Sequence, residues 1–150
     1  MTPQEAEAKR FFYRGRVRSV YDGDTVRMDI DLGMGVWVQN HSIRLWGIDT
    51  PEIRTKDPEE KRRGYNARDA LREMVLGEKV YIETFKDKSG KYGRLLGVIW
   101  ADLEPTQEQG SGGLLNVNLQ LVLSGLAEPT EKRYIEAKKA HIEVEKGLQA

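Results

Sequence analysis

The sequence predicts an α+β fold, in which a small five-stranded β-barrel is followed by two further helices. Three observations lead to this prediction. Apolar and polar residues alternate in the first third of the chain, a well-capped helix follows, and two more strand-like segments come before two helix-like ones.

The first third of the chain predicts three strands. Residues 11–20 are rich in β-branched and aromatic side chains, and residues 25–32 place apolar side chains at every second position. Asp22-Gly23 between them is a typical hairpin turn. We expect a third strand over residues 36–48, after two glycines interrupt the alternation.

The middle of the chain carries the clearest helix signal. Asp57 suits the N-cap, Pro58 suits the first helical position, and Glu60 stands three residues after the cap. These residues predict a helix that begins at Pro58 and ends near Gly77.

The remaining segments complete the order of a small barrel. Strands are predicted over residues 79–85 and 94–100, and helices over residues 116–124 and 131–146. Three strands, a helix and two strands is the order of an OB-fold, a barrel that often binds nucleic acids or oligosaccharides.

Length and composition set broader bounds. A chain of 150 residues has the size of a single domain, and we expect one domain over residues 1–150 with a flexible N-terminal tail over residues 1–10. The chain has no cysteine, so its redox environment cannot be inferred.

Charge excludes a uniformly basic nucleic-acid binder. Lysine plus arginine and aspartate plus glutamate number 24 each, so any attraction of a polyanion must come from a local patch. The first residues are polar, and no stretch is apolar enough to span a bilayer. We expect a cytoplasmic monomer without membrane contact, and secretion only if a further segment precedes Met1.

Three separate motifs supply charged groups suited to cleaving phosphodiesters. They are Asp22-Gly23-Asp24-Thr25, residues 44–52 with the sequence RLWGIDTPE, and Lys91-Tyr92-Gly93-Arg94. The reaction needs a group that activates water and cations that stabilise charge on the phosphate oxygens. Glu52 suits the first role.

Arg44 and Arg94 suit the second role, since arginine bonds two phosphate oxygens at once and stays charged. Asp24 and Asp49 add carboxylates without a nearby histidine or cysteine in sequence. Such a hard oxygen set favours calcium or magnesium over zinc.

In these motifs the chain resembles the staphylococcal nuclease, or thermonuclease, family. That family has a D-G-D-T turn, an R-L-x-x-x-D-T-P-E segment and a Y-G-R segment in this order, and the match runs over about residues 20–126. The resemblance implies a nuclease that requires Ca²⁺ and cleaves single-stranded or frayed DNA and RNA with low sequence specificity. It also implies products that end in a 3′-phosphate.

The same resemblance implies a role for each matching residue. Asp24, Asp49 and the backbone carbonyl of Thr50 would bind calcium, and Glu52 would be the general base or position the water. Arg44 and Arg94 would stabilise the transition state. Lys91 and Tyr92 would contact a substrate phosphate.

Two departures from the family pattern concern the C-terminal third. After Ala127, family members commonly carry aromatic residues that shape the base pocket, whereas here the sequence EPTEKR separates Ala127 from Tyr134. Tyr134 is the candidate substitute. The C-terminus also lacks the tryptophan that often closes this fold, which leaves the packing of the last helix open.

The alternative function is a non-catalytic OB-fold module that binds nucleic acid or a protein, as degenerate nuclease-like repeats do in Tudor-containing proteins. Each motif alone also has an ordinary explanation, since Asp22-Gly23-Asp24 is most often a plain turn. Glu52 discriminates between the two functions, because a phosphate binder has no need of it. A purely structural domain would leave Arg44 and the three carboxylates unexplained.

Overall fold

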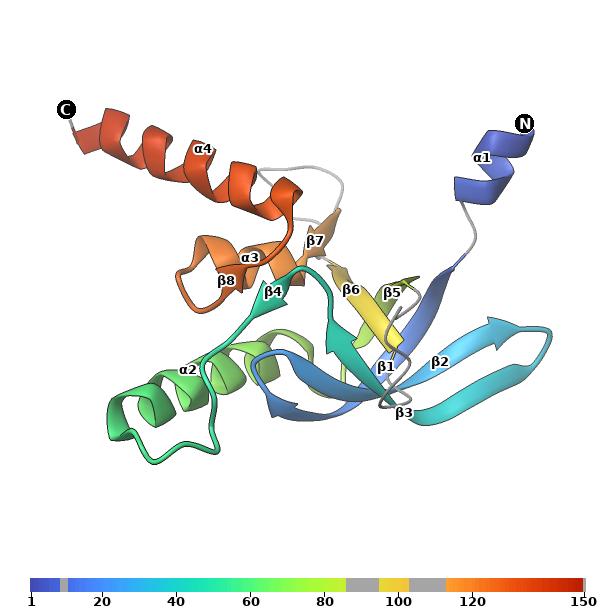
Figure 1. Ribbon diagram of the computed structural model, residues 1–150. Helices are drawn as coiled ribbons and strands as arrows, with labels where there is room; N and C mark the ends of the chain where they lie inside the picture. The colour runs from blue at the N-terminus through green and yellow to red at the C-terminus, as the bar shows by residue number, and fades with distance from the viewer. Residues whose placement is uncertain (9–10, 86–94, 103–112, 150) are drawn as a thin grey trace, which may run out of the picture.

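A computed structural model gives the fold and describes residues 1–8, 11–85, 95–102 and 113–149 (Figure 1). The strands are β1 (Phe12–Asp22), β2 (Thr25–Gly33), β3 (Val36–Leu45), β4 (Ile48–Asp49), β5 (Lys79–Phe85), β6 (Leu95–Asp102), β7 (Leu114–Asn116) and β8 (Glu128–Pro129). The helices are α1 (Pro3–Ala8), α2 (Pro58–Val75), α3 (Val117–Leu123) and α4 (Lys132–Gln149).

The long strands close into a barrel. Hydrogen bonds join them in the order β3-β2-β1-β5-β6, and a parallel pairing of β3 with β6 completes the ring. The other neighbours in the barrel are antiparallel, and β7 pairs with the far part of β6. The predicted five-stranded OB-type barrel with additional helices is therefore confirmed.

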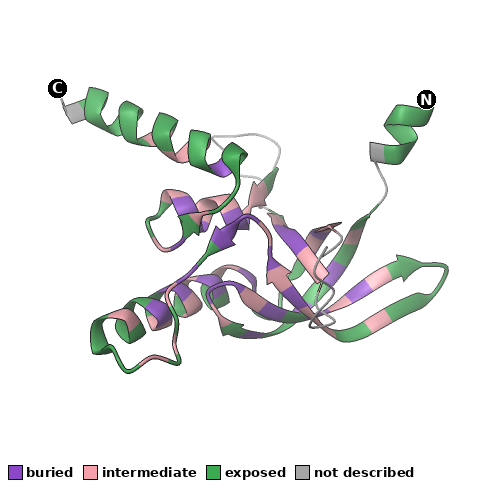
Figure 2. Cartoon of the chain, in the orientation of Figure 1, coloured by how far each residue is buried: buried purple, intermediate pink, exposed green. Residues whose placement is uncertain are grey.

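Alternating apolar side chains fill the barrel. Val26, Met28 and Ile30 of β2 point inward and are buried, as are Val17 and Val20 of β1. Each such side chain contributes about 1.5–3 kcal/mol when it is fully buried. Figure 2 shows burial concentrated in the barrel and the adjoining helices, whereas α4 and the β2–β3 hairpin are largely exposed.

Helix α2 packs against the barrel through one face. Its buried residues are spaced three or four positions apart, as a single helix face requires: Gly64, Ala67, Leu71 and Val75. The Asp57 side chain accepts a hydrogen bond from the Glu59 N–H at 3.0 Å, so the predicted cap is formed. Gly77 then donates its N–H to the Val17 carbonyl at 3.0 Å and joins the end of the helix segment to β1.

Asn118 of α3 ties the helical layer to the barrel. Its Oδ1 accepts the Ile99 N–H at 3.1 Å, and its Nδ2 donates to the carbonyls of Trp46 at 2.8 Å and Gly97 at 3.0 Å. A fully buried amide with these three bonds fixes the place where β3, β6 and α3 meet.

The third strand is shorter than the predicted range 36–48. β3 ends at Leu45, and Gly47 adopts a φ of 79°, which disfavours any residue with a Cβ. A Cβ on Gly47 would also lie 2.7 Å from the Tyr134 ring. The chain leaves the barrel here, and the separate strand β4 pairs with β8.

The N-terminal segment contains helix α1, which the sequence did not predict. Thr2 Oγ1 accepts the Glu5 N–H at 3.1 Å and Glu5 Oε2 accepts the Thr2 N–H at 3.0 Å, a capping box. The expected flexibility of residues 1–10 stays a prediction. Among the described residues, no helix is both long and apolar enough to cross a membrane.

Candidate functional site

A turn and a strand end bring the first two motifs together. Asp24 lies in the turn between β1 and β2, and Arg44 lies near the end of β3, opposite Thr25. The Leu45 N–H donates to the Asp24 carbonyl at 2.8 Å, so the turn is held against β3. Residues 20 positions apart thereby become neighbours through strand pairing.

The guanidinium of Arg44 connects the predicted carboxylates. Its Nη1 forms an ion pair with Asp24 Oδ2, and its Nη2 lies 3.4 Å from Asp49 Oδ1. Nη2 also donates to the Ile48 carbonyl at 3.3 Å. Because the Arg44 side chain is only 25% exposed, these contacts operate in partly dehydrated surroundings and are stronger than on an open surface.

Asp24 is held as a carboxylate. Its Oδ1 accepts the Thr25 hydroxyl at 3.2 Å, and its Oδ2 accepts the Thr50 N–H at 3.2 Å. Burial alone would raise the pKa of Asp24, but the hydrogen bond with Asp22, the charge of Arg44 and the Thr50 N–H outweigh it. The pKa of Asp24 is therefore lowered.

Asp22 is the opposite case. Burial, followed by the hydrogen bond with Asp24 and the negative charge of that neighbour, raises the pKa of Asp22 to about 6. Its Oδ1 also accepts the Asp24 N–H at 3.1 Å. The two acids titrate as a pair, in which Asp22 is the group that holds the proton.

Glu52 lines a cleft next to this cluster. The cleft measures about 360 Å³ and lies between the segment after β4, the first half of α2 and the turn before β8. Its wall includes Asp49, Thr50, Glu52, Glu60, Arg63 and Glu128. The Glu52 N–H donates to Glu60 Oε1 at 3.3 Å, while its own carboxylate is exposed and has no partner among the described residues.

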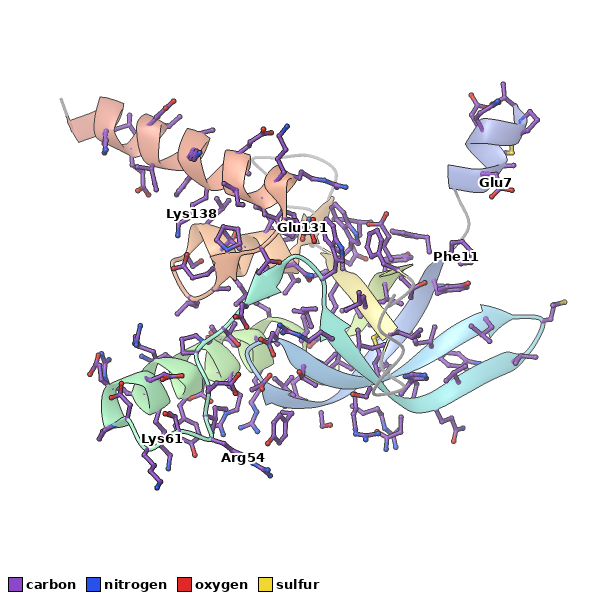
Figure 3. The ribbon with its side chains drawn as sticks, in the orientation of Figure 1. Glu7, Phe11, Arg54, Lys61, Glu131 and Lys138 are labelled. Atoms are coloured by element: carbon purple, nitrogen blue, oxygen red, sulfur yellow. The ribbon has the colours of Figure 1, made fainter. Side chains whose placement is uncertain are left out.

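Two contacts position the segment that carries Glu52. A Cβ on Gly64 would lie 2.9 Å from the Pro51 carbonyl oxygen and 3.0 Å from that of Glu52, so only glycine allows α2 to approach this closely. Arg54, on the loop between β4 and α2 (Figure 3), places its guanidinium 5.9 Å from the centre of the Tyr21 ring. Both contacts involve residues within two positions of Glu52.

Negative charge is concentrated where β4 meets β8. Asp49 lies directly opposite Glu128 across this antiparallel pair, an arrangement that is unfavourable unless cations offset it. Arg44 contacts Asp49, and Lys138 of α4, labelled in Figure 3, forms an ion pair with Glu128 at 3.1 Å. The site therefore already uses positive charge to balance its carboxylates.

The donor set fits a hard divalent cation. Asp24 and Asp49 share one guanidinium, and the Thr50 peptide adjoins Asp24, so two carboxylates and a backbone carbonyl belong to one small region. The Thr50 hydroxyl is buried without a hydrogen-bond partner among the described residues. In those same residues, no three histidine, aspartate or glutamate side chains form a metal cluster, so water or a ligand would have to complete the coordination.

Comparison with known proteins decides the family. A family model described as "Staphylococcal nuclease homologue" matches residues 42–148, well over half of the chain. This chain belongs to the staphylococcal nuclease family. The resemblance inferred from the three motifs is thereby confirmed.

Individual relatives include two thermonucleases, in agreement with this family. The chain is 35% identical over 118 residues to Protein ParB of Escherichia coli, covering 76% of this chain and 55% of the relative. It is 30% identical over 94 residues to the thermonuclease of Staphylococcus hyicus, covering 63% and 52%. A third match, to the thermonuclease of Staphylococcus intermedius, has 28% identity over 135 residues and covers 87% and 70%. The chain thus spans about half the length of the first two relatives.

The structure gathers five of the predicted site residues of this nuclease-family chain. Asp24, Arg44, Asp49 and Thr50 are linked by hydrogen bonds or ion pairs, and Glu52 lines the adjoining cleft. The other three, Lys91, Tyr92 and Arg94, lie outside the described residues.

Tyr134 does not provide an aromatic face for the cleft. It is 1% exposed, its ring meets Trp46 edge-on at 5.3 Å, and its hydroxyl accepts a hydrogen bond from Asn116 Nδ2 at 3.2 Å. The candidate substitute for a base-pocket aromatic is therefore a core residue that anchors the start of α4. The last helix is thus attached to the core through Tyr134.

Sequence reasoning missed Asp22 and Gly64. In the sequence Asp22 belongs to a turn motif, and its place two residues before Asp24 is the signal that could have indicated a pair of carboxyl groups. Gly64 interrupts a strongly helical segment, and an isolated glycine at such a position commonly marks close packing. What it packs against could come only from the tertiary structure.

Proposed function

We propose that this protein is a calcium-dependent nuclease that hydrolyses phosphodiester bonds. The observation that carries the proposal is the cluster in which Arg44 joins Asp24 and Asp49 beside the cleft that contains Glu52. Hydrolysis of a phosphodiester in a polyanion requires such a combination of a cation, carboxylates and an accessible base. The thermonucleases among the relatives support the same reaction class.

Glu52 is proposed to orient and deprotonate the attacking water. Its carboxylate is exposed and unpaired among the described residues, so it can accept a proton from a water in the cleft. The Glu52 backbone is fixed by the Glu60 carboxylate and by the close approach of Gly64. A base held by its main chain can act without first being ordered.

Arg44 is proposed to stabilise negative charge on the reacting phosphate. A guanidinium that is three-quarters buried and fixed by Asp24, Asp49 and the Ile48 carbonyl undergoes little reorganisation during the reaction. By resemblance to the family, Arg94 shares this task, and Lys91 and Tyr92 contact a substrate phosphate. These three residues lie outside the described part of the chain.

Asp24, Asp49 and the carbonyl of Thr50 would hold Ca²⁺. When bound, the ion would supply positive charge to the scissile phosphate and offset the repulsion between the neighbouring carboxylates. Magnesium has the same ligand preference but tolerates less irregular coordination, so calcium is the proposed ion.

The proposed substrates are single-stranded or frayed DNA and RNA, cut with low sequence specificity to leave 3′-phosphate ends. Contacts to phosphates and stacking on bases do not distinguish one base from another strongly. Fragment lengths in the assay below distinguish internal cutting from cutting at an end. The cytoplasmic location and the monomeric state remain predictions from the sequence.

The test compares wild-type protein with Glu52→Gln on labelled single-stranded DNA and RNA, each with calcium, magnesium or chelator. Gln keeps the shape but cannot take a proton, so we expect calcium-dependent cutting to fall about 10²–10⁴-fold. Glu73→Gln, an exposed residue of α2 outside the cleft, is the charge-matched control and should cut normally. Nucleic acid that is bound but left intact by the wild type would instead favour the non-catalytic module.

A further inference from the structure

The first barrel strand carries an arginine at every second position. Arg14, Arg16 and Arg18 of β1 are exposed, while Gly15 and Val17 between them are buried. A strand alternates its side chains, so all three arginines lie on the outer face of the barrel. Arg27 of β2 is exposed on the same side. We call these four residues the outer arginine face.

Two of these arginines have no hydrogen-bond or ion-pair partner in the described part of the chain. Arg14 and Arg16 make no hydrogen bond or ion pair there. In contrast, Arg18 contacts Asp29 at 3.3 Å and Arg27 donates to the Asn40 carbonyl at 2.8 Å. Arg14 and Arg16 are therefore free to bind an external anion.

The nearby carboxylates only partly offset this charge. Asp29 is occupied by Arg18 and by the Asn40 N–H at 2.8 Å, and Asp31 accepts the Gly33 N–H at 2.8 Å. Asp29, Asp31 and Asp102 line a hollow that Arg14 and Arg16 also line, and Glu83 stands opposite Phe12 across β1 and β5. Lys79, opposite Arg16, adds a further cation without a partner among the described residues.

Aromatic side chains adjoin the arginines. A hollow of about 480 Å³ is lined by both Arg14 and Arg16 and by Trp37 and Tyr81. Trp37 is 51% exposed, a large fraction for a tryptophan. Phe12 stacks on Tyr81 with ring centres 5.8 Å apart. Cations interleaved with exposed rings are the typical surface for single-stranded nucleic acid.

The outer arginine face continues toward the cluster around Arg44. On β2, Thr25, Arg27, Asp29 and Asp31 occupy alternate positions and share one face of the sheet. Strand pairing places Thr25 opposite Arg44 and Asp31 opposite Trp37. The sheet formed by β1, β2 and β3 (Figure 1) therefore joins the candidate active site to the aromatic hollow, although irregularities interrupt the register of both strand pairs.

We propose that the outer arginine face, with Trp37 beside it, binds the substrate strand beyond the phosphate that is cleaved. The inference rests on the proposed nuclease function and adds a second binding surface to it. A chain with equal numbers of acidic and basic residues needs a local patch to hold a polyanion, and Arg14 and Arg16 supply it. Arginine forks bind phosphates and Trp37 stacks on a base.

The test measures binding, in chelator, of a long labelled DNA single strand. The variants are Arg14→Gln/Arg16→Gln and the control Lys139→Gln/Lys146→Gln, which removes the same charge from exposed positions of α4. We expect the first variant to bind the long strand on the order of tenfold more weakly at low salt. The slope of log affinity against log salt should fall by about 1.4, the value for two phosphate contacts to a single strand.

Trp37→Ala provides a second measurement. Loss of base stacking should weaken binding of the long strand by about fivefold or more, and the salt slope should not change. Since Trp37 and both arginines are exposed, the variants should keep the circular dichroism spectrum and melting temperature of the wild type.

Each failure has a distinct meaning. If the wild type binds and cuts nucleic acid but Arg14→Gln/Arg16→Gln matches the control, this second surface is wrong and the proposed function stands. If the wild type neither binds nor cuts, the proposed function itself fails. Loss of a concentration-dependent dimer in sedimentation, with affinity for the long strand intact, would assign the face to protein association and overturn the inference.

Discussion

Arginines occur at two ends of the same sheet in opposite states. Arg44 is mostly buried and held by Asp24, Asp49 and a backbone carbonyl, whereas Arg16 is exposed and has no partner among the described residues. A fixed, partly dry guanidinium acts through its geometry, and a solvated one acts through its charge. The same residue type is therefore expected to tolerate substitution very differently at the two ends.

Among the substitutions that test this comparison, the largest effect should come from Arg44→Lys. Lysine keeps the charge but cannot contact Asp24, Asp49 and the Ile48 carbonyl with a planar fork, so the rate of DNA cleavage should fall about 10²–10³-fold. Arg16→Lys should leave binding of a long strand nearly unchanged, because counterion release depends on charge. The measurements are single-turnover cleavage and salt-dependent binding.

The two lysine variants can contradict the proposed contrast between Arg44 and Arg16 in two ways. Near-normal cleavage by Arg44→Lys would mean that charge alone suffices at the candidate active site. An Arg16→Lys variant as weak in binding as Arg16→Gln would mean that the outer face also relies on the bidentate geometry of arginine.

The next largest effect is expected at Gly64, where close packing and helix propensity make opposite demands on the residue. Gly64→Ala places a Cβ 2.9 Å from the Pro51 carbonyl oxygen, so the segment that carries Glu52 must shift. A shift of about 1 Å can cost up to about 10²-fold in rate, and we expect cleavage to fall 10- to 100-fold. Stability should not show the gain that alanine usually brings to a helix.

Gly147→Ala is the matched control in α4. Apart from its chain neighbours and the backbone of its own helix, no atom lies within 4 Å of the Cβ that it would add, and the position is helical. The substitution should raise the free energy of unfolding by up to about 1 kcal/mol and leave cleavage unchanged. Equal behaviour of the two variants in thermal melts and in cleavage would remove Gly64 as a positioning residue.

The elements of the barrel could be predicted from the sequence because their signals are local. Alternation identified β2, and Asp57 with Pro58 identified the start of α2. The end of β3 was missed because Gly47 stands among apolar residues, and the ring that packs against it belongs to Tyr134, 87 positions away in sequence. A distant contact of this kind leaves no local pattern.

The candidate site likewise has features that could be predicted from the sequence and features that depend on the whole fold. The motifs identified Asp24, Arg44 and Asp49, and the contact between Asp24 and Arg44 follows from the pairing of β2 with β3. The proton carried by Asp22 depends on burial, and burial is a property of the whole fold. Likewise, the alternation of Arg14 and Arg16 is visible in sequence, but the continuity of their face with Arg44 depends on strand register.

The smallest effect concerns stability, and it sharpens the contrast between buried and exposed charge. The pKa of Asp22 is raised from 3.8 to about 6, so between these pH values the folded state binds more protons than the unfolded state. Stability contributed by this group is therefore lost as pH rises from about 4 to 6 and stays lost above pH 6. The lowered pKa of Asp24 acts in the opposite sense, because its stabilisation is lost only as pH falls below about 4.

Asp22→Asn imitates the protonated acid. The amide keeps an oxygen for the Asp24 N–H and can donate to the Asp24 carboxylate, as the protonated acid does. Urea unfolding in chelator should show a variant that matches the wild type near pH 4 and exceeds its free energy of unfolding from pH 6 upward. Parallel pH profiles would show that Asp22 is not protonated in the fold near pH 5. The carboxyl pair would then carry two negative charges, and the positive charge of Arg44 would have to offset both.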